Sequence, residues 1–104
     1  MASQWKIALS RDAKKQYKKL AHCGHKKPSL LDVIDAFVLD LRQQGPILVG
    51  WPHYGVIHES KTELYYHCHL KRGHPTYVAC WRVTNVEENK IEVFYVGTHE
   101  GAPY

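Results

Sequence analysis

Residues 65–74, YYHCHLKRGH, concentrate side chains that can move protons and hold anions. They include three histidines and two cations, namely His67, His69 and His74 with Lys71 and Arg72. Histidine titrates at a pKa of about 6.5, so near neutral pH it can accept or donate a proton. Arginine and lysine carry fixed positive charge that can stabilise a phosphate. Such a set suits a metal site, cleavage of a phosphodiester, or a polar strand and turn with no chemistry.

A metal site needs ligands that converge on one point. Structural zinc sites use two close pairs of ligands, such as C-x2-C with H-x3-H. Alternate side chains of a strand point to opposite faces, so His67 and His69 share a face and Cys68 points away from them. We therefore expect no metal and no other cofactor, and we keep a metal-binding protein only as an alternative.

Cleavage of RNA without a metal needs a base for the 2′-hydroxyl proton, an acid for the departing 5′ oxygen, and cations around the phosphate. An aromatic side chain can stack on an unpaired base and hold the strand open. Residues 65–74 supply all of these groups on one strand face and its following turn. On these residues alone, a solvent-exposed strand face with a basic turn is the simpler interpretation.

The chain before this segment predicts one strand and two helices. Residues 4–9 have the composition of a strand, and Ser10 is a suitable N-cap for a helix from Arg11 to about Cys23. A second helix should begin at Ser29 and end before the Gly45–Pro46 pair. Apolar residues at helical spacing should face the core, which in the first helix means Ala13, Tyr17, Leu20 and Ala21. The two helices should form a hairpin against one face of a sheet.

The rest of the chain predicts three strands. Residues 46–60 are interrupted by prolines and glycines, and we expect them to be irregular. Strands should then cover 62–70, 76–83 and 90–97, and the second of these is apolar enough to be central. Nothing regular is expected in the tail THEGAPY. The tryptophans should be core residues, and His53 and His58 should be exposed.

Length and charge limit the classes of function. With 104 residues the chain is expected to be a single domain spanning 1–104. Residues 1–27 contain eight basic residues and one acidic residue, a net charge of +7, whereas the remainder has six basic and nine acidic residues. Four exposed lysines of the first helix, Lys14, Lys15, Lys18 and Lys19, should form a basic ridge. This ridge suits nucleic acid or an acidic protein, or it is simply a solvated helix face.

The expected compartment is the cytoplasm, with no membrane contact. No apolar run approaches the length of about 20 residues that spans a bilayer, and the N-terminal residues lack the apolar middle of a secretory signal. The three cysteines are an odd number without regular spacing, so a disulfide framework is not expected. Cys68 and Cys80 should be buried thiols.

Several motifs occur together in one order along the whole chain. The opening strand WKIALS enters a lysine-rich helix, a second amphipathic helix follows, and three strands end in VFYVGTHEGAPY. This pattern resembles the RelE/ParE superfamily of toxins from type II toxin–antitoxin systems, and within it the RelE-, YafQ- and HigB-like mRNA interferases. The ending is similar to the closing strand, Gly-Thr-His and terminal aromatic of the YafQ-like branch. CHL at 68–70 is similar to a Cys-His-Ile of that branch.

The resemblance implies an α+β fold in which a two-helix hairpin packs on a small, twisted, mostly antiparallel sheet, in the order β-α-α-β-β-β. It also implies a ribosome-dependent mRNA endoribonuclease that inhibits translation. In that reaction the 2′-hydroxyl attacks the phosphate, a 2′,3′-cyclic phosphate forms, and no metal takes part. The implied partners are a cognate antitoxin protein, the ribosome and mRNA, and the basic ridge would contact ribosomal RNA. The free chain is expected to be a monomer.

The resemblance carries catalytic roles only onto matching residues. His99, from the Gly-Thr-His, matches the histidine expected to be the principal acid or base, and His69 matches an active-site histidine. His67 or His74 would assist His69, and Tyr104 would stack on or orient the substrate. The hypothesis therefore requires His69 and His99 to lie together over a shared cationic hollow.

The chain departs from the family pattern at its cations. Tyr77 and Val78 stand where many RelE-like enzymes have an arginine, and an arginine of the last YafQ-like strand is replaced around Tyr95. The phosphate would then have to be held by Lys71, Arg72 or Arg82.

These departures keep two other functions open. One is a ParE-like gyrase-inhibiting toxin, which needs no acid–base pair. The other is a non-catalytic or degenerate binding protein of the same fold. The density of histidines, and His99 in particular, favours the endoribonuclease over the gyrase inhibitor.

Overall fold

The computed structural model describes residues 4–22, 28–59, 64–73 and 75–104. Within these ranges the chain forms β1 (Lys6–Leu9), α1 (Arg11–His22), α2 (Pro28–Gln44), β2 (Gly55–Glu59), β3 (Leu64–Lys71), β4 (Tyr77–Asn85), β5 (Lys90–Thr98) and a short 3-10 helix (His99–Gly101). The α+β class and the order of the predicted elements are confirmed. The strand β2 and the 3-10 helix were not predicted.

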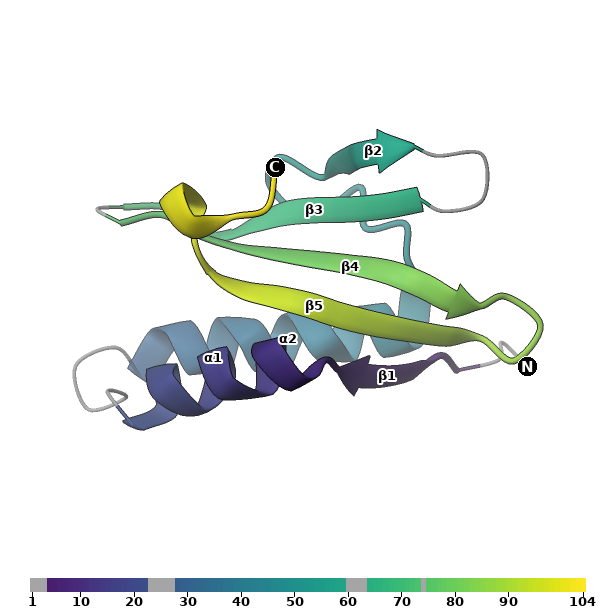
Figure 1. The fold of residues 1–104 in the computed structure, drawn as a ribbon, viewed down its shortest axis with the longest axis horizontal. Coiled ribbons are helices and arrows are strands. Elements are labelled where there is room, and N and C mark those ends of the chain that lie inside the picture. The colour runs from purple at the N-terminus through teal and green to yellow at the C-terminus, as the bar shows by residue number, and fades with distance from the viewer. Residues whose placement is uncertain (1–3, 23–27, 60–63, 74) are drawn as a thin grey trace.

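The strands form one sheet in the order β1-β5-β4-β3-β2. β1 runs parallel to β5, and the other neighbouring pairs are antiparallel. β4 is the central strand, as its nearly continuous apolar sequence predicted. Figure 1 shows α1 and α2 side by side on one side of this sheet, which confirms the predicted helical hairpin.

The unpredicted strand β2 lies at an edge of the sheet. It begins at Gly55, the last of the prolines and glycines that interrupt residues 46–60, and it pairs antiparallel with β3. Its register shifts between Val56 and His58, which is the irregularity expected of a bulged edge strand. The prediction of an irregular segment was wrong here because five residues with a bulge show too little alternation to be recognised.

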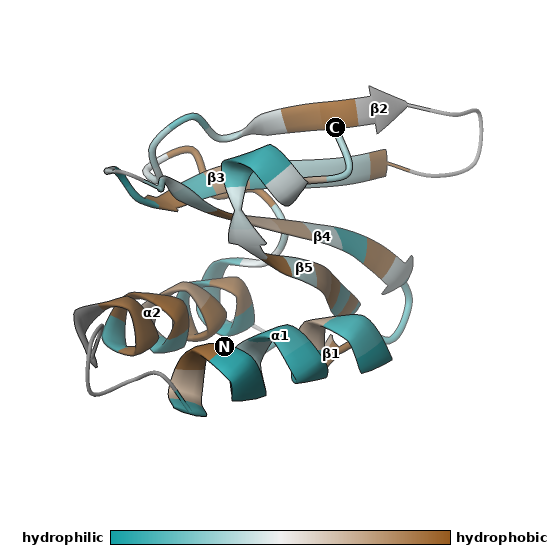
Figure 2. Cartoon of the chain, turned by 60° about the vertical axis from the view of Figure 1, so that its left-hand side comes forward, coloured by the Kyte–Doolittle hydropathy of each residue, from teal (hydrophilic) through white to brown (hydrophobic). Residues whose placement is uncertain are grey.

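The two helices bury different amounts of apolar surface. Figure 2 shows α1 as mainly hydrophilic and α2 as mainly hydrophobic. Ser10 caps α1 as predicted, since its hydroxyl accepts a hydrogen bond from the backbone N–H of Ala13 at 3.1 Å. Ala13 is buried, and Tyr17 and Leu20 pack against the core, but Ala21 is exposed. The prediction for Ala21 was wrong because its methyl group, in the last turn of α1, is too short to reach the core that Leu20 contacts.

Aromatic side chains form the centre of the core between α2 and the sheet. Trp81 and Phe37 are completely buried, and their rings meet edge-on with centroids 5.2 Å apart. Trp51 meets Phe37 edge-on at 5.6 Å, and Tyr66 stacks on Trp81 at 5.8 Å. The indole N–H of Trp81 donates to the carbonyl oxygen of Pro46 at 3.0 Å, so this donor stays hydrogen-bonded although the side chain is buried. The prediction that the tryptophans are core residues is confirmed.

The face of the sheet opposite the α-helices is covered in part by short segments of the chain. As predicted, the residues of β3 alternate between the two faces: Tyr66, Cys68 and Leu70 are buried in the core, and Tyr65, His67 and His69 lie on the other face. We call this second face the open face. The chain after β5 turns back across it beside β3 (Figure 1). The open face is therefore where the C-terminal end of the chain meets the histidines of β3.

None of the helices that the structure describes is both long and apolar enough to cross a membrane.

Truncation of the central phenylalanine should test this core. We expect Phe37→Ala to lower the free energy of unfolding by about 3–5 kcal/mol, because it leaves a cavity against two tryptophans. The matched control is Leu39→Ala on the same helix, whose side chain is 47% exposed and whose loss should cost less than about 1 kcal/mol. Urea unfolding monitored by tryptophan fluorescence measures both. Equal losses for the two variants would contradict this assignment of the core.

Candidate active site on the open face

β3 places two histidines on the open face. His67 pairs with Cys80 of β4, and His69 pairs with Val78, so each imidazole stands over a buried β4 residue. The edge strand leaves room for His67 because a Cβ on Gly55 would lie only 3.3 Å from its Nε2. The backbone N–H of His69 donates to the carbonyl oxygen of Pro52 at 2.8 Å, which ties the loop before β2 to this end of β3. These contacts place both residues on the open face at this end of β3.

The tail, residues 98–104, brings a third histidine to the same place. The hydroxyl of Tyr95 donates to the carbonyl oxygen of Thr98 at 2.6 Å, and the backbone N–H of His99 donates to the carbonyl oxygen of Thr76 at 2.8 Å. The 3-10 helix closes when the N–H of Ala102 donates to the carbonyl oxygen of His99 at 3.2 Å. The tail is thus fastened to β5 and to the residue before β4 where it starts to cross the open face.

The rings of the tail and of β3 are in contact. The centroids of His69 and His99 are 5.4 Å apart in an edge-on arrangement. Tyr104 stacks on His67 at 4.5 Å and meets His99 edge-on at 5.7 Å. The proximity of His69 and His99 predicted from the sequence is confirmed. Tyr104 is 42% exposed but packed, rather than projecting into solvent. We call His67, His69, His99 and Tyr104 the histidine cluster.

A further histidine, whose place could not be predicted from the sequence, lies beside the cluster. His53 is exposed, as expected, but its ring stacks on His69 with centroids 4.2 Å apart. Its backbone has a φ of 53°, in the left-handed region that non-glycine residues rarely adopt. The loop before β2 holds this conformation, and a sequence carries no pattern that marks such a position. His58, the other histidine of this segment, has its side chain outside the described part of the structure.

Burial and neighbouring charge favour the neutral form of two imidazoles. Burial lowers the pKa of His67, and the nearby His53 and His99 lower it further. The pKa of His69 is lowered in the same way, first by burial and then by His53, His99, His67 and Arg72. A neutral imidazole can accept a proton, so both residues are suited to act as bases near neutral pH. The Nδ1 atom of His67 is buried without a hydrogen-bond partner among the described residues.

His69 separates two hollows in the surface. On one side is a hollow of about 720 Å³ that we call the histidine hollow, lined by His69, Gly73, Pro75, Thr76, Thr98, His99 and Glu100. On the other side is a smaller hollow of about 190 Å³ that we call the basic niche, lined by Pro52, His53, His69, Leu70, Lys71 and Arg72. His69 and His99 therefore line the open histidine hollow, and Lys71 and Arg72 line the basic niche on the other side of His69.

The predicted cations do not all gather at this site. Lys71 and Arg72 are exposed beside His69, whereas Arg82 forms a salt bridge with Glu92, with Nη2 3.0 Å from Oε1. Lys14, Lys15, Lys18 and Lys19 are exposed along α1, on the helix side of the molecule. His74 lies outside the described residues. Arg82 is thus engaged by an acidic neighbour, and the basic ridge lies on the helix side, away from the histidine cluster.

A thiol lies beneath the cluster but cannot act as a nucleophile. Cys80 is completely buried, and burial raises its pKa to about 12. Cys68 is equally buried on the core side, and both cysteines are free, as predicted. In the described parts of the chain, no group of three or more His, Cys, Asp or Glu residues is arranged to hold a metal ion. The groups available for chemistry at this site are the imidazoles.

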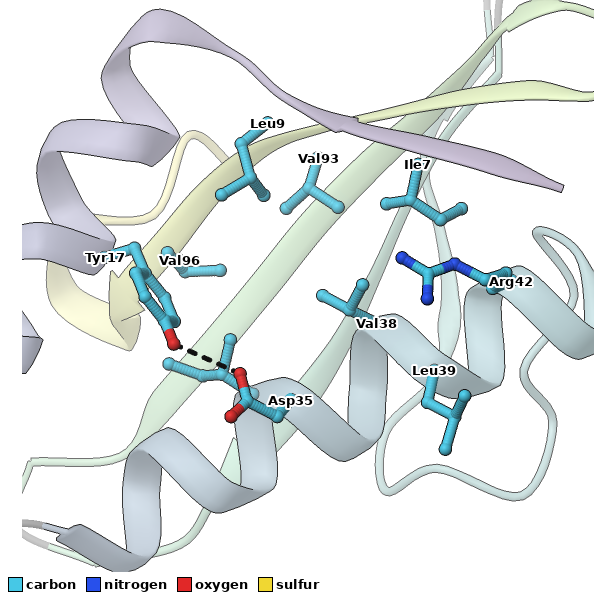
Figure 3. Close-up of a pocket in the computed structure, with 10 residues that line it drawn as sticks. Ile7, Leu9, Tyr17, Asp35, Val38, Leu39, Arg42, Val93 and Val96 are labelled. Atoms are coloured by element: carbon cyan, nitrogen blue, oxygen red, sulfur yellow. Dashed lines mark hydrogen bonds between the residues drawn. The ribbon is translucent and has the colours of Figure 1, made fainter.

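The helix side carries a different kind of hollow, of about 420 Å³. Figure 3 shows it between β1, α1 and α2, with apolar side chains such as Leu9 and Val38 pointing into it. At one end the hydroxyl of Tyr17 donates to Asp35 at 3.1 Å, and Arg42 lies at the other. This hollow contains no pair of imidazoles, so the open face is the better candidate for an active site.

Comparison with known proteins identifies the fold. No protein-family profile and no curated protein sequence matches this chain. Among solved structures, the chain is similar to the YoeB dimer from Staphylococcus aureus, with a TM-score of 0.67 and 17% sequence identity. The similarity covers 92% of this chain and 98% of that chain. At this identity the comparison establishes the fold, and it confirms the RelE-like architecture that the sequence predicted.

A double-mutant cycle should test how the tail is held. A Cβ on Gly101 would lie 2.8 Å from the hydroxyl oxygen of Tyr95. We expect Gly101→Ala to displace the tail at a cost of about 1–3 kcal/mol, and to weaken the nuclear Overhauser contacts between Tyr104 and His67. In a Tyr95→Phe background the same change should cost less, because the colliding oxygen is absent.

The control for this cycle is Gly50→Ala, since a Cβ on Gly50 meets nothing within 4 Å. It should leave both the stability and the ring contacts unchanged. Purely additive effects of Gly101→Ala and Tyr95→Phe would refute the idea that the hydroxyl limits the position of the tail.

Proposed function

We propose that this protein is a type II toxin that cleaves mRNA on the ribosome. The observation that carries the proposal is the contact between His69 and His99, whose rings meet at 5.4 Å beside an open hollow. The fold adds support, because YoeB is itself a toxin with a RelE-like fold. The two imidazoles come from distant parts of the chain, which is typical of a site assembled for acid–base chemistry.

In the proposed reaction two imidazoles move protons while the RNA supplies the nucleophile. His69, whose lowered pKa favours the neutral form, takes the proton of the 2′-hydroxyl. The 2′ oxygen bonds to phosphorus as the bond to the 5′ oxygen breaks, and His99 gives a proton to that oxygen. The products are a 2′,3′-cyclic phosphate and a 5′-hydroxyl, with no net change in protons once the two imidazoles exchange.

The neighbours of this pair have supporting roles in the proposal. Lys71 and Arg72 lie beside His69 and would offset the charge that develops on the phosphate oxygens. His53 stacks on His69 and would act as a positioning residue. Tyr104, stacked on His67, offers an aromatic face to a base next to the cut.

The partners follow from the same hypothesis. A toxin of this class is held inactive by a cognate antitoxin protein, and it reaches its substrate on the ribosome. The basic ridge on α1 lies on the helix side, away from the histidine cluster, so it can contact ribosomal RNA while the open face engages mRNA. The proposed setting is the cytoplasm, where both partners occur.

Removal of the tail histidine should abolish cleavage. We expect His99→Ala to lower the rate of mRNA cleavage in a translating extract by about 10²–10⁴-fold, because general acid–base catalysis typically contributes that much. Primer extension on the mRNA measures the cuts, and circular dichroism confirms that the variant is folded. The matched control is His22→Ala, an exposed histidine in the last turn of α1, which should keep full activity.

Two outcomes would count against the proposal. Full activity in folded His99→Ala would remove His99 from the site. Growth arrest with intact mRNA and a block in DNA supercoiling would favour a ParE-like gyrase inhibitor instead.

Neutralising the basic ridge should weaken ribosome association. We expect the quadruple change of Lys14, Lys15, Lys18 and Lys19 to glutamine to reduce affinity most at low salt, because fewer counterions are released on binding. The slope of log affinity against log salt should become shallower by about 0.7–0.9 for each phosphate that the variant no longer neutralises. Sedimentation with ribosomes at several salt concentrations measures this. The control is the quadruple arginine variant, which keeps the charge and should bind normally. Equal binding by the wild type and both variants would show that the ridge is only a solvated helix face.

A further inference from the structure

The end of the tail rests on β3 through aromatic rings. Tyr104 stacks on His67 with centroids 4.5 Å apart and meets His99 edge-on at 5.7 Å, and the rings of His99 and His69 are 5.4 Å apart. The start of the tail is held differently, because the backbone N–H of His99 donates to the carbonyl oxygen of Thr76 at 2.8 Å. The chain can therefore keep this anchor while the ring of His99 turns to solvent and residues 100–104 leave β3.

The charged and titratable groups around these rings are mostly basic. They come from the loop before β2, from β3 and the residue after it, and from the tail, and they are His53, His67, His69, Lys71, Arg72 and His99. Among the described residues that line the histidine hollow, Glu100 is the acidic one. Burial raises the pKa of the Cys80 thiol beneath the cluster to about 12, and it also raises the pKa of the Tyr104 phenol, so both stay neutral. Glu100 can offset one added charge, and further charged imidazoles would repel one another.

The closest pair of imidazoles remains in place when the tail moves. His53 stacks on His69 with centroids 4.2 Å apart, and neither residue belongs to the tail. Repulsion between charged rings is therefore relieved most easily by the movable partner, which is His99 at 5.4 Å from His69. The contact between His69 and His99 is the one that protonation would break first.

His67 resists protonation while Tyr104 covers its ring. Its Nδ1 atom is buried and has no hydrogen-bond partner among the described residues. A neutral imidazole can leave this nitrogen without a proton, whereas a charged imidazole has an N–H on both nitrogens. A charged ring would gain attraction to the face of Tyr104, but this gain is smaller than the cost of a buried, charged donor with no acceptor. Lifting Tyr104 from the ring would admit water to His67 and remove that cost.

The pKa shifts have the direction that this geometry requires. Burial, then His53 and His99, lower the pKa of His67, and the pKa of His69 is lowered by burial and by its cationic neighbours. When the tail is released, both pKa values move back toward the ordinary value of about 6.5. The released form then binds protons that the docked form excludes, so docking is strongest above about pH 7.5 and weakens as the pH falls below about 6.5. Each proton taken up on release lowers the equilibrium constant for docking about tenfold per pH unit.

We propose that the tail leaves β3 in mildly acidic solution, when the histidine cluster takes up protons. In the released form the ring of His99 no longer stands beside His69, and the acid–base pair of the proposed cleavage is taken apart. This regulatory consequence rests on the proposed function, whereas the movement of the tail does not. Mild acid would thus stop cleavage by separating the two imidazoles as well as by protonating the base.

The test is nuclear magnetic resonance spectroscopy of the full chain without RNA, from pH 8 to pH 5. We expect the Overhauser contact between the rings of Tyr104 and His67 to be strong at pH 7.5 and lost near pH 5. The amide signal of Tyr104 should follow the same transition, and the docking constant should fall at least tenfold between pH 6.5 and 5.5. The signals of Phe37 and Trp81 should not change, because the core on the helix side stays folded.

Two variants assign the transition to the cluster. His67→Gln removes the imidazole with the unpartnered Nδ1, and His69→Gln removes the contact with His99 while it keeps the stacking partner of Tyr104. In each variant the transition of the Tyr104 amide should involve about one proton fewer and should therefore be less steep. The matched control is His22→Gln, an exposed histidine in the last turn of α1, which should give the wild-type curve.

Three outcomes would overturn the inference. The first is a Tyr104 signal that is unchanged from pH 8 to pH 5. The second is loss of the Tyr104 and Trp81 signals together, because acid would then unfold the whole chain. The third is a wild-type curve in both His67→Gln and His69→Gln.

The same data separate this inference from the proposed cleavage. A chain that fails to cut mRNA at neutral pH would contradict the proposed function, and its tail transition could still be measured. A chain that cuts mRNA and shows no tail transition would refute the release of the tail and leave the proposed function standing.

Discussion

The tail is folded back over the sheet by the hydroxyl group of Tyr95. That group donates to the carbonyl oxygen of Thr98 at 2.6 Å, and a Cβ on Gly97 or on Gly101 would lie 2.9 or 2.8 Å from it. The two glycines and the tyrosine therefore form a single unit, in which each residue is required by the others. This unit turns the chain after β5 back across the open face, so His99 reaches β3 and not solvent. Without it, the histidines of β3 would form only a polar strand face.

The helix hairpin makes this arrangement possible by covering only one face of the sheet. Packing of Phe37 against Trp81 satisfies the core on the helix side and leaves the opposite side of β4 to smaller groups. There Cys80 is completely buried although no α-helix covers it, because His67 and the tail lie above it. The imidazoles consequently serve as packing groups as well as candidate bases. Burial is also the largest cause of the lowered pKa values of His67 and His69. The packing that holds these imidazoles in place therefore also favours their neutral, proton-accepting form.

The sequence predicted elements with long periodic patterns and missed contacts that depend on loop geometry. The helices, the central strand and the alternation along β3 follow from hydrophobic spacing, which is a local property. The meeting of His69 with His99 was predicted through resemblance to a family, because no spacing rule connects positions so far apart along the chain. His53 was missed, since its place beside His69 depends on a left-handed backbone conformation and on a hydrogen bond to the Pro52 carbonyl. Tyr95 stood out in the sequence only as a replaced arginine, and its hydroxyl contact became visible in three dimensions.

That replacement also changes how charge is distributed over the open face. With Arg82 engaged by Glu92, positive charge near the histidine cluster comes from Lys71, the last residue of β3, and from Arg72, which follows it. Charges at exposed positions are screened by solvent, so they hold a phosphate less firmly than a buried arginine would. If the proposed cleavage takes place here, weak contacts to the phosphate would have to be offset by a scaffold that delivers the substrate, and the ribosome has that role in the proposal.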